Sequence, residues 1–386
     1  MNIMSDSEKT ANSQLGTKGR VRIGIFLSFS GQGGVERMML NLAEGLSSMG
    51  CLVDLITVKT ASSYLNCPLE GIRLVNLGVS HTFAATIPLA RYLQQHRPAA
   101  LLAAKDRANV VAVAANAISR TKTRLILRMG TTVSAALGGK RPLKEKLWYT
   151  RMRLFYPHAD AVVAVSKGVA ADLMKNAGLS PSLVYVIPNP VITPKLLTLA
   201  QEPLDHPWFQ DGAPPVILGV GRLTKQKDFP TLIKAFARVR KSFQCRLVIL
   251  GEGQDRPKLE ALIAGLGLKS DTLLPGFVQN PYPYFKRASL FVLSSAWEGS
   301  PNVLTEALAL GTPVVSTDCP NGPKEILQGG RFGPLVPVGD VKALSEAMLR
   351  TLKNPLEKSF LKSAVKDYTL EESTRRYLNL FLGSSY

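Results

Sequence analysis

The chain has 386 residues, of which 46% are hydrophobic and 19% charged, and this composition excludes both an intrinsically disordered chain and a single small domain. Its net charge of +19 predicts partners that carry phosphate: nucleic acid, anionic lipid or a phosphorylated substrate. The four cysteines, Cys51, Cys67, Cys245 and Cys319, have no paired spacing, so we expect neither disulfides nor a zinc site, and a reducing compartment.

The N-terminal residues 1–20 are polar and of mixed charge, and we expect them to form a flexible tail. They contain no apolar segment of the kind that marks a secretory signal. No apolar run in the chain reaches the roughly 18 residues that a membrane-spanning helix needs, so no such helix is predicted.

Alternating strand and helix patterns begin after this tail. The run VRIGIFLSFS at 21–30 predicts a buried strand, and a glycine-rich turn follows at 31–34. A helix is expected over 35–49, where apolar residues recur at helical spacing until Gly50 ends it. Further strands of this half are expected at 52–58, 73–77, 100–104, 124–128, 161–165 and 184–187.

A second series of strands and helices follows a proline-rich stretch. Its strands are expected at 216–220, 246–250, 272–274, 290–293, 313–316 and 332–336, and its helices at 229–241, 256–266, 282–287, 303–310, 323–328 and 341–352. We therefore predict an α/β protein with two Rossmann-like, doubly wound domains that face each other across a cleft. The expected limits are 21–195 for the first domain, 196–214 for the linker, 215–365 for the second domain and 366–386 for a C-terminal helix that returns to the first domain.

The most informative segment runs from Glu298 through a Gly-Ser-Pro-Asn loop to Glu306. Ser300 or Asn302 is expected to cap a helix that starts near Val303. The N–H groups at the start of that helix would then be open and would form a binding site for a diphosphate. The residues expected to contribute them are Asn302, Val303 and Leu304.

Two glutamates accompany this helix start. Glu306 lies about one turn into the helix, where its carboxylate can accept hydrogen bonds from ribose hydroxyls, and Glu298 lies on the preceding loop, where it can accept from sugar hydroxyls. A glutamate in a first helical turn is also common without any ligand, because it complements the helix dipole. The pairing with Glu298 and the loop between them favours ligand binding over that simpler explanation.

A second candidate segment follows the first strand of the second series. It places Arg222, Lys225 and Lys227 at the carboxyl end of a buried strand, where they would face the cleft. The arginine suits bidentate contact with phosphate oxygens and a lysine acts as a point charge. A solvated basic loop is the alternative. Arg222 and Lys227 are functional candidates only because they lie in the same domain as the helix that starts near Val303.

Glycines supply weaker signals at two strand ends. Gly33 and Gly34 let the backbone approach a ligand before the first helix, although a simple tight turn explains them nearly as well. The turn matches neither a dinucleotide fingerprint nor a P-loop. Gly253 lies in a Gly-Glu-Gly turn that we expect to line the cleft.

Together these residues resemble the retaining glycosyltransferase family 4, whose members have the GT-B fold. The resemblance covers about residues 21–352. It is carried by Gly33-Gly34-Val35-Glu36-Arg37, Gly221-Arg222-Leu223 with Lys227-Asp228, Gly251-Glu252-Gly253, the pair Glu298 and Glu306, Gly311-Thr312-Pro313-Val314-Val315, and the segment from Asp318 to Glu325.

The resemblance implies a role for each of these positions. Arg222 and Lys227 would hold the donor diphosphate, Glu306 would bind ribose, and Glu298 would contact the transferred sugar. Many members use UDP-sugars, and several extend glycans on polyprenyl diphosphate or on the lipopolysaccharide core. The chain has no Asp-x-Asp motif, which fits an enzyme that uses no metal and no cofactor beyond its nucleotide-sugar donor.

The first domain departs from the family pattern. Members often carry a His-Gly pair after a middle strand, whereas this chain reads Arg128-Met129-Gly130 there. Asp106, at another strand end, is a candidate catalytic-site residue that orients the acceptor. The four histidines have no metal-ligand or triad spacing, and His81 is the one that merits a test.

Basic residues concentrate between positions 120 and 153, where ten Lys or Arg accompany the single acid Glu145. Within this region, the segment 143–156 predicts a helix lying on an anionic membrane surface. Its lipid-facing residues would be Leu143, Leu147, Trp148, Met152 and Phe155. An ordinary surface helix explains the segment equally well, and the net charge of the chain leads us to favour the membrane-surface helix. We expect a cytoplasmic protein, peripheral at the inner face of the plasma membrane.

The reaction implied by the resemblance retains the anomeric configuration, and the leaving group is a nucleoside diphosphate. The donor is expected to be a UDP-sugar, and the acceptor a lipid-linked or cell-envelope glycan. A nucleotide-sugar epimerase or a phosphorylase on the same fold is an alternative, although nothing marks the pyridoxal-phosphate lysine that a phosphorylase needs. A basic protein that binds nucleic acid without catalysis would explain the charge but not the two glutamates, and no nucleic-acid module is present.

Overall fold

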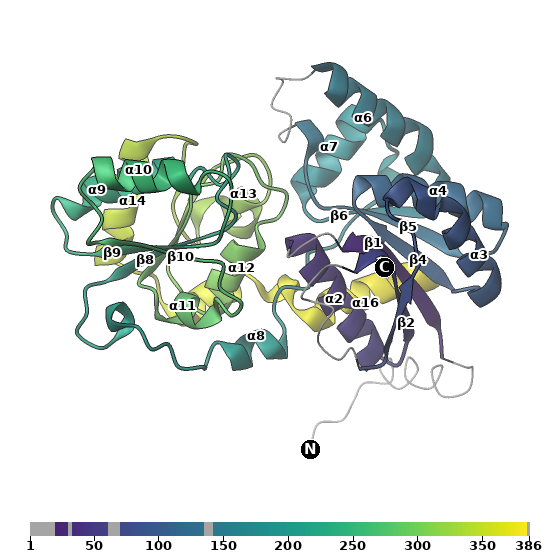
Figure 1. Ribbon diagram of the computed structural model, residues 1–386, viewed down its shortest axis with the longest axis horizontal. Helices are drawn as coiled ribbons and strands as arrows, with labels where there is room; N and C mark the ends of the chain where they lie inside the picture. The colour runs from purple at the N-terminus through teal and green to yellow at the C-terminus, as the bar shows by residue number, and fades with distance from the viewer. Residues whose placement is uncertain (1–19, 30–32, 61–69, 135–141, 384–386) are drawn as a thin grey trace.

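The protein consists of two α/β domains joined by two crossing segments (Figure 1). The computed structural model describes residues 20–29, 33–60, 70–134 and 142–383, so most of the expected N-terminal tail lies outside the described residues. Each domain is built on one parallel sheet with helices on both faces, which confirms the predicted fold class.

The first sheet has seven strands in the order β3-β2-β1-β4-β5-β6-β7. Its strands are β1 (Arg22–Phe29), β2 (Leu52–Thr60), β3 (Ile72–Asn76), β4 (Ala100–Ala104), β5 (Arg124–Met129), β6 (Ala161–Ala164) and β7 (Val184–Val186). Strands β4 and β6 are buried along their whole length, as expected for parallel strands covered by helices on both faces. The chain reverses its winding direction between β1 and β4, where doubly wound sheets place their ligands.

Helices cover this sheet on two sides. One face packs against α2 (Gly34–Ser48) and, from the far end of the chain, α16 (Leu370–Leu382). The other packs against α3 (Thr86–His96), α4 (Asp106–Ser119), α6 (Pro142–Phe155) and α7 (Lys167–Ala177).

The second sheet has six strands in the order β10-β9-β8-β11-β12-β13. They are β8 (Val216–Val220), β9 (Arg246–Leu250), β10 (Thr272–Gly276), β11 (Leu290–Leu293), β12 (Val314–Thr317) and β13 (Leu335–Val336). Helices α9 (Phe229–Arg240), α10 (Arg256–Gly265) and α14 (Val341–Lys353) pack on one face, and α11 (Tyr282–Arg287), α12 (Asn302–Ala309), α13 (Pro323–Ile326) and α15 (Lys358–Ser363) on the other. The reversal of winding lies here between β8 and β11.

The chain crosses between the domains twice, and the two crossings lie side by side. The amide nitrogens of Val191 and Ile192 donate to the carbonyl oxygen of Tyr368 at 3.1 and 3.0 Å, and the Leu370 amide donates to the carbonyl of Ile192 at 2.8 Å. The start of α16 is fastened next to them, where the Ser373 hydroxyl donates to the Pro188 carbonyl at 3.0 Å. The two crossings therefore form one hinge.

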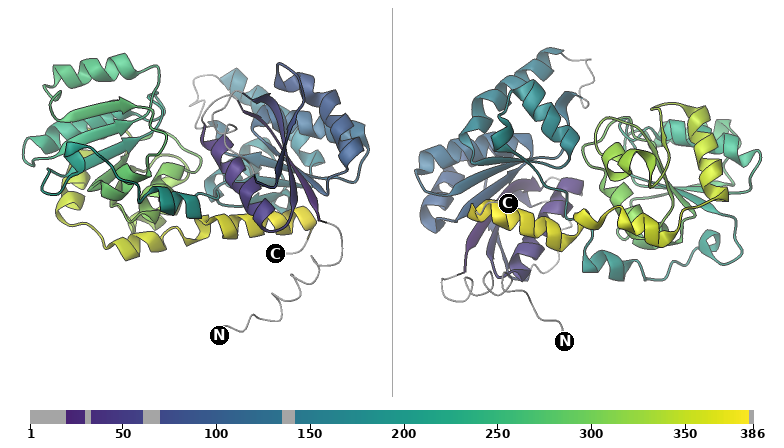
Figure 2. Two further views of the ribbon diagram at one scale, coloured as in Figure 1. Left: turned by 60° about the horizontal axis from the view of Figure 1, so that its bottom comes forward. Right: turned by 180° about the vertical axis from the view of Figure 1, so that it is seen from behind.

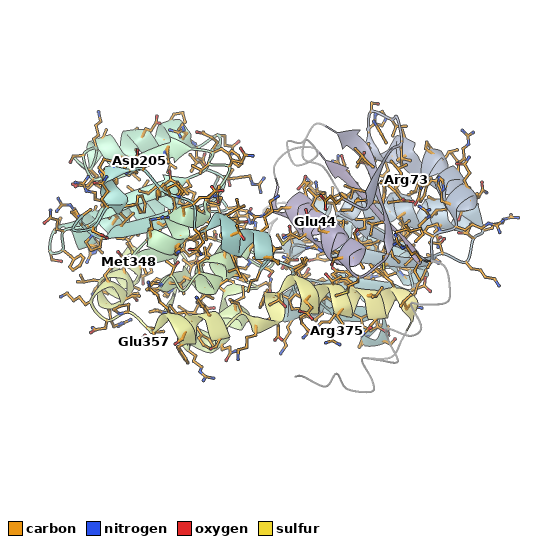
Figure 3. All side chains as sticks on the ribbon, turned by 90° about the horizontal axis from the view of Figure 1, so that it is seen from below. Glu44, Arg73, Asp205, Met348, Glu357 and Arg375 are labelled. Atoms are coloured by element: carbon orange, nitrogen blue, oxygen red, sulfur yellow. The ribbon has the colours of Figure 1, made fainter. Side chains whose placement is uncertain are left out.

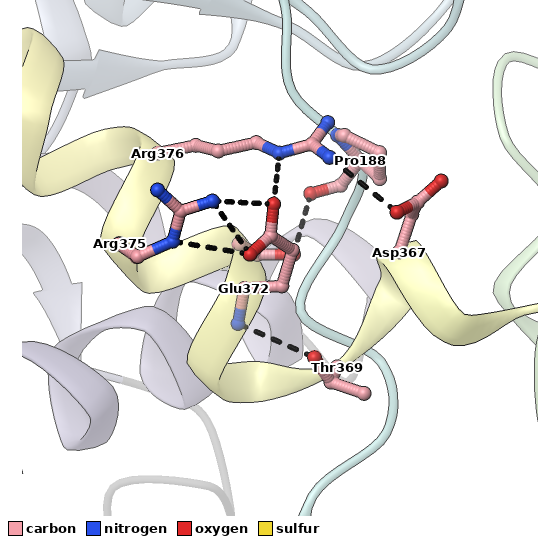
Figure 4. Close-up of polar contacts among 7 residues, drawn as sticks. Pro188, Asp367, Thr369, Glu372, Arg375 and Arg376 are labelled. Atoms are coloured by element: carbon pink, nitrogen blue, oxygen red, sulfur yellow. Dashed lines mark hydrogen bonds and ion pairs between the residues drawn. The ribbon is translucent and has the colours of Figure 1, made fainter. Parts of the chain in front are cut away.

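The side chain of Thr369 caps α16 just after the hinge, accepting a hydrogen bond from the Glu372 amide at 3.2 Å (Figure 4). Arg375 and Arg376 both donate to the carboxylate of Glu372. Burial alone would raise the pKa of Glu372, but these two guanidinium groups outweigh it and hold that pKa below its usual range. From there α16 runs along the first domain, and Figure 3 shows Arg375 on it beside that domain while Met348 and Glu357 belong to the second.

The stretch between the first crossing and β8 is folded against the second domain. It contains α8 (Pro194–Leu199), whose Leu199 carbonyl accepts from the Asn280 side chain at 3.0 Å. Further along, the guanidinium carbon of Arg246 lies 4.5 Å from the ring centre of Trp208. The proline-rich residues therefore follow the surface of the second domain.

Helix α6 differs from its expected orientation. Met152 is fully buried in the core of the first domain, and Trp148 and Phe155 pack against that core, so the expectation that these three face lipid is wrong. The apolar side chains that α6 exposes are Leu143, Leu147 and Leu154. Among the described residues, no helix combines the length and the apolar character needed to traverse a bilayer.

Candidate active site

The second domain gathers three loops at the carboxyl edge of its sheet. The loop after β8 is bound to the loop after β11, because the Ala296 amide donates to the Gln226 carbonyl at 2.8 Å and the Ser294 hydroxyl to the Lys227 carbonyl at 2.7 Å. The loop after β12 joins them through the Glu298 amide, which donates to the Pro320 carbonyl at 3.3 Å. This junction lies at the winding reversal of the sheet.

Lys227 and Glu298 meet at this junction. The Lys227 Nζ lies 2.6 Å from Glu298 Oε1, and the Ser295 hydroxyl donates to the same oxygen at 2.7 Å. Both charged side chains are largely buried. Gly221 lies beneath the lysine: its φ is +156°, and a Cβ there would stand 2.9 Å from the Lys227 Cε. A side chain at this φ would be strained and would crowd the lysine where it folds back toward Glu298, which favours glycine here. Arg222, the next residue, is exposed at the same edge.

Helix α12 begins beside this pair and differs in detail from the prediction. It starts at Asn302 with Pro301 as its N-cap, and no side chain caps it, so the expected cap by Ser300 or Asn302 is wrong. The Leu304 amide, expected to be open, donates to the Pro301 carbonyl at 3.0 Å. The amides of Asn302 and Val303 have no partner among the described residues, so they are open donors at the positive end of the helix dipole.

Glu306 lies one turn into α12 and is 1% exposed. Its Oε1 accepts a hydrogen bond from Arg37 of the first domain, whose guanidinium also donates to the Tyr282 hydroxyl. Its Oε2 is buried and has no hydrogen-bond partner among the residues described. Burial raises the pKa of Glu306, and the nearby charges of Arg37 and Lys227 oppose that rise without cancelling it. A buried acceptor atom with no protein partner calls for a donor from outside the chain, such as an ordered water or a bound ligand.

The two domains touch around this site through glycines. A Cβ on Gly299 would lie 2.3 Å from the Gly130 carbonyl oxygen of the first domain, and a Cβ on Gly34 would lie 3.4 Å from Asn302 Nδ2. Gly33 is the N-cap of α2, next to the Glu36 carboxylate. These contacts bring the start of α2 to the start of α12. By contrast, Gly253 lies against the backbone of Leu223, where a Cβ would meet a carbonyl oxygen at 2.3 Å.

A cavity of about 550 Å³ lies in the first domain at its own winding reversal. The end of β1, the start of α4, the residues before α3 and one side of α6 form its walls. Its lining residues are Ser28, Ser80, His81, Thr82, Lys105, Asp106, Arg107, Ala108, Lys144, Trp148 and Arg151.

Two ion pairs hold the walls of this cavity. Lys105 Nζ lies 2.6 Å from Glu36 Oε1 and donates to the Ser28 carbonyl at 3.0 Å. Asp106 pairs with Arg151 and accepts from the Tyr156 hydroxyl at 3.3 Å. Burial raises the pKa of Asp106, against the opposing charge of Arg151. With two carboxylates already paired to Lys105 and Arg151, the exposed cations Arg107 and Lys144 leave the cavity positively charged.

The structure thus brings together Lys227, Glu298, Glu306 and the start of α12, with Arg222 and the Gly33-Gly34 turn at the edges of this group. It puts Asp106 in the separate cavity of the first domain, and Gly253 behind the loop after β8. The sequence alone indicated no role for Arg37 or for Asn189, whose Nδ2 donates to Asn302 Oδ1 at 2.8 Å. Arg37 was part of the quoted glycine-rich motif, but its partner Glu306 is 269 residues away in the chain, and no local signal marks Asn189.

Comparisons with known proteins identify the family. The family model of Glycosyltransferase Family 4 matches residues 32–194, and that of Glycosyl transferases group 1 matches residues 214–354. A curated relative from Campylobacter jejuni is 33% identical over 357 residues, which are 90% of this chain and 93% of the relative. Its name is N-acetylgalactosamine-N,N'-diacetylbacillosaminyl-diphospho-undecaprenol 4-alpha-N-acetylgalactosaminyltransferase. The Lipopolysaccharide 1,6-galactosyltransferase of Salmonella typhimurium is 31% identical over 48% of this chain and 50% of its own length.

Solved structures agree in fold. The apo form of a lipopolysaccharide outer core galactosyltransferase aligns with a TM-score of 0.71 and 19% identity, over 94% of this chain and 99% of that one. HepE of Anabaena in complex with UDP aligns with a TM-score of 0.72 and 18% identity, over 93% of this chain and 99% of that one. On the strength of these matches, the chain belongs to glycosyltransferase family 4 and is a sugar-transferring enzyme of the GT-B fold.

Proposed function

We propose that this enzyme transfers a sugar from a UDP-sugar, with retention of configuration and without a metal, to a glycan carried on polyprenyl diphosphate or on another cell-envelope lipid. The observation that carries the donor side is the meeting of Lys227, the open amides of α12 and the buried Glu306 at one edge of the second sheet. A diphosphate followed by a ribose matches this order of cation, helix start and hydroxyl acceptor.

The donor residues would share the nucleotide between them. Arg222 and Lys227 would contact the diphosphate oxygens together with the amides of Asn302 and Val303, and the turn at Gly33-Gly34 would approach from the first domain. Glu306 would accept hydrogen bonds from the ribose hydroxyls, and its unpartnered Oε2 supports this role. Glu298, held by Lys227 and Ser295, would accept from hydroxyls of the transferred sugar. Leu304 and Gly253 would shape the site through their backbone.

The chemical step would break the bond between the anomeric carbon and a phosphate oxygen and form a bond from that carbon to the acceptor oxygen. The acceptor hydroxyl would attack from the face that the diphosphate leaves, and its proton would pass to a departing phosphate oxygen. Negative charge grows on the diphosphate as the bond breaks. Preorganised cations and amides at that position stabilise it, and removing one such group typically raises the barrier by about 3 kcal/mol.

The cavity of the first domain would hold the acceptor. Its cationic wall suits an acceptor that carries phosphate, and two relatives from Campylobacter jejuni have undecaprenol diphosphate glycans in their names. Asp106 would orient the acceptor from the start of α4, with Arg151 fixing the position of its carboxylate. His81, hydrogen-bonded to Ser80, lines the same cavity and would also contact the acceptor.

An anionic membrane surface would be the working place of the enzyme, at the cytoplasmic face of the plasma membrane. Leu143 is 80% exposed and Leu147 68% exposed on α6, next to the cavity-lining Lys144 and to the exposed Lys146. Apolar side chains among lysines are the composition of a helix that lies on anionic lipid. Flotation with vesicles that contain phosphatidylglycerol should carry the protein upward at low salt, and absence of binding there would refute the membrane association.

The donor assignment is tested by an Arg222→Ala, Lys227→Ala double variant. Its transfer from radiolabelled UDP-sugars to an extract of membrane lipids should fall by a hundredfold or more, since two charges that stabilise the leaving group are gone. Lys225→Ala, an exposed lysine of the same loop, is the matched control and should retain activity. Transfer by the wild type should persist in excess chelator. Unchanged activity of the double variant would overturn the donor assignment, and loss of wild-type transfer in chelator would overturn the metal-independent mechanism.

A further inference from the structure

A fully buried arginine lies in the first domain, next to the Gly130 contact with the second domain. Arg128, at the end of β5, is 2% exposed and has no carboxylate partner among the described residues. Its Nη2 donates to Asn189 Oδ1 at 2.5 Å, while its Nε and Nη1 have no hydrogen-bond partner there. Burial raises the pKa of the neighbouring Tyr377, and the positive charge of Arg128 opposes that rise. Burying an unpaired cation is costly, so its retention calls for a physical reason.

Arg128 fixes the direction of a chain of hydrogen bonds that crosses between the domains. A guanidinium only donates, so the side chain of Asn189 must turn its oxygen toward Arg128 and its Nδ2 away. That Nδ2 donates to Asn302 Oδ1 at 2.8 Å. The Asn302 amide must therefore keep its oxygen toward Asn189 and present its own Nδ2 on the other side.

The exposed end of this chain lies at the proposed donor site. Asn302 is the first residue of α12, and its Nδ2 lies 3.4 Å from where a Cβ of Gly34 would be. The side-chain N–H groups thus stand between the helix start and the glycine turn of the first domain. They add hydrogen-bond donors to the open backbone amides of Asn302 and Val303.

We propose that Arg128 and Asn189 are positioning residues that hold the Asn302 amide with its N–H groups toward the diphosphate of the nucleotide. This inference rests on the proposed donor site and adds a ligand to it. A reversed amide would direct a carbonyl oxygen at the phosphates, replacing attraction by repulsion. Because hydrogen bonds to charged groups are strong, the reversal should weaken nucleotide binding by roughly tenfold to a hundredfold.

Asn189→Asp reverses the chain without removing an atom from the core. The new carboxylate still accepts from Arg128, and as an acceptor it turns the Nδ2 of Asn302 toward itself and the oxygen toward Gly34. Calorimetry should give a UDP dissociation constant at least about tenfold above that of the wild type. The melting temperature should be unchanged or higher, because the carboxylate neutralises the buried guanidinium. A merely structural role of Asn189 would instead lower both the affinity for UDP and the melting temperature.

A double-mutant cycle assigns the effect to Asn302. Asn302→Ala removes the amide that Asn189 orients, so Asn189→Asp should cause no further loss of UDP affinity in that background. Asn302→Asp, which leaves Asn189 and Arg128 intact but presents an oxygen at the site, should bind UDP more weakly than Asn302→Ala. The inference is overturned if Asn189→Asp binds UDP like the wild type, or if its effect is the same with and without the Asn302 side chain.

The same measurements separate this inference from the donor site on which it depends. If the wild type and the Arg222→Ala, Lys227→Ala variant bind UDP equally, the proposed donor site fails. If that double variant loses its affinity for UDP, while the effects of the Asn189 and Asn302 substitutions on UDP affinity are additive, the donor site stands. Only the orienting role of Arg128 and Asn189 then fails.

Discussion

Glu306 meets two opposing requirements in one side chain. A carboxylate accepts hydrogen bonds from ribose best when it is charged, whereas burial in α12 favours its neutral form and raises its pKa. Arg37, which reaches it from the first domain, reduces this conflict by pairing with Oε1. In the proposed donor site this residue would link nucleotide binding to the contact between the domains, at a cost in stability.

Glu306→Gln should separate the effect of this carboxylate on stability from its effect on UDP binding. Because the folded pKa is raised, the unfolded chain releases this proton first as pH rises, so wild-type stability falls between the usual value near 4.5 and the raised value. Glutamine does not titrate. The free energy of unfolding of the Glu306→Gln variant in urea should equal that of the wild type at pH 4 and exceed it at pH 7. The variant's affinity for UDP should be lower than that of the wild type. A stability difference that stays constant between these pH values would contradict the buried, pKa-raised carboxylate.

The strands were the most predictable elements, and the reasons are local. The bounds of β4, β8, β9 and β11 agree with those expected, because continuous apolar runs bounded by polar or glycine residues leave little choice. Helix α12 began one residue earlier than expected and without a side-chain cap, because Pro301 took the capping position. The apolar residues of α6 surround much of the helix, so the side that packs is decided by the neighbouring elements, which bury Met152 and Tyr149.

Helix α6 offers a matched pair of lysines for testing the acceptor cavity. Lys144 lines it and Lys146, also exposed, does not, so Lys144→Glu and Lys146→Glu change the net charge equally. Lys144→Glu should raise KM for a polyprenyl-diphosphate-linked acceptor by roughly tenfold relative to Lys146→Glu, because the new carboxylate repels the phosphates. Neither change should alter UDP affinity. Equal effects on KM would assign the cations to general attraction by the membrane and refute the acceptor cavity.

At the scale of the whole molecule, the site depends on contacts that no single segment encodes. The Ser166 hydroxyl donates to the Gly299 carbonyl at 2.8 Å, the Asn321 side chain to the Thr132 hydroxyl at 2.6 Å, and Asn189 to Asn302 across 113 residues. The sequence predicted two facing domains and the candidate donor-site residues of the second domain. It could not predict Arg37 or Asn189, since their partners are set by how the hinge brings the domains together.

The most direct test is a crystal structure of the enzyme with UDP. The diphosphate should lie within hydrogen-bond distance of the Val303 amide and of the side chains of Arg222 and Lys227, with the ribose on Glu306. Lys227 would then exchange its contact with Glu298 for a phosphate oxygen. UDP bound away from the start of α12, or bound there without either cation, would contradict the donor site from which the rest of the function is derived.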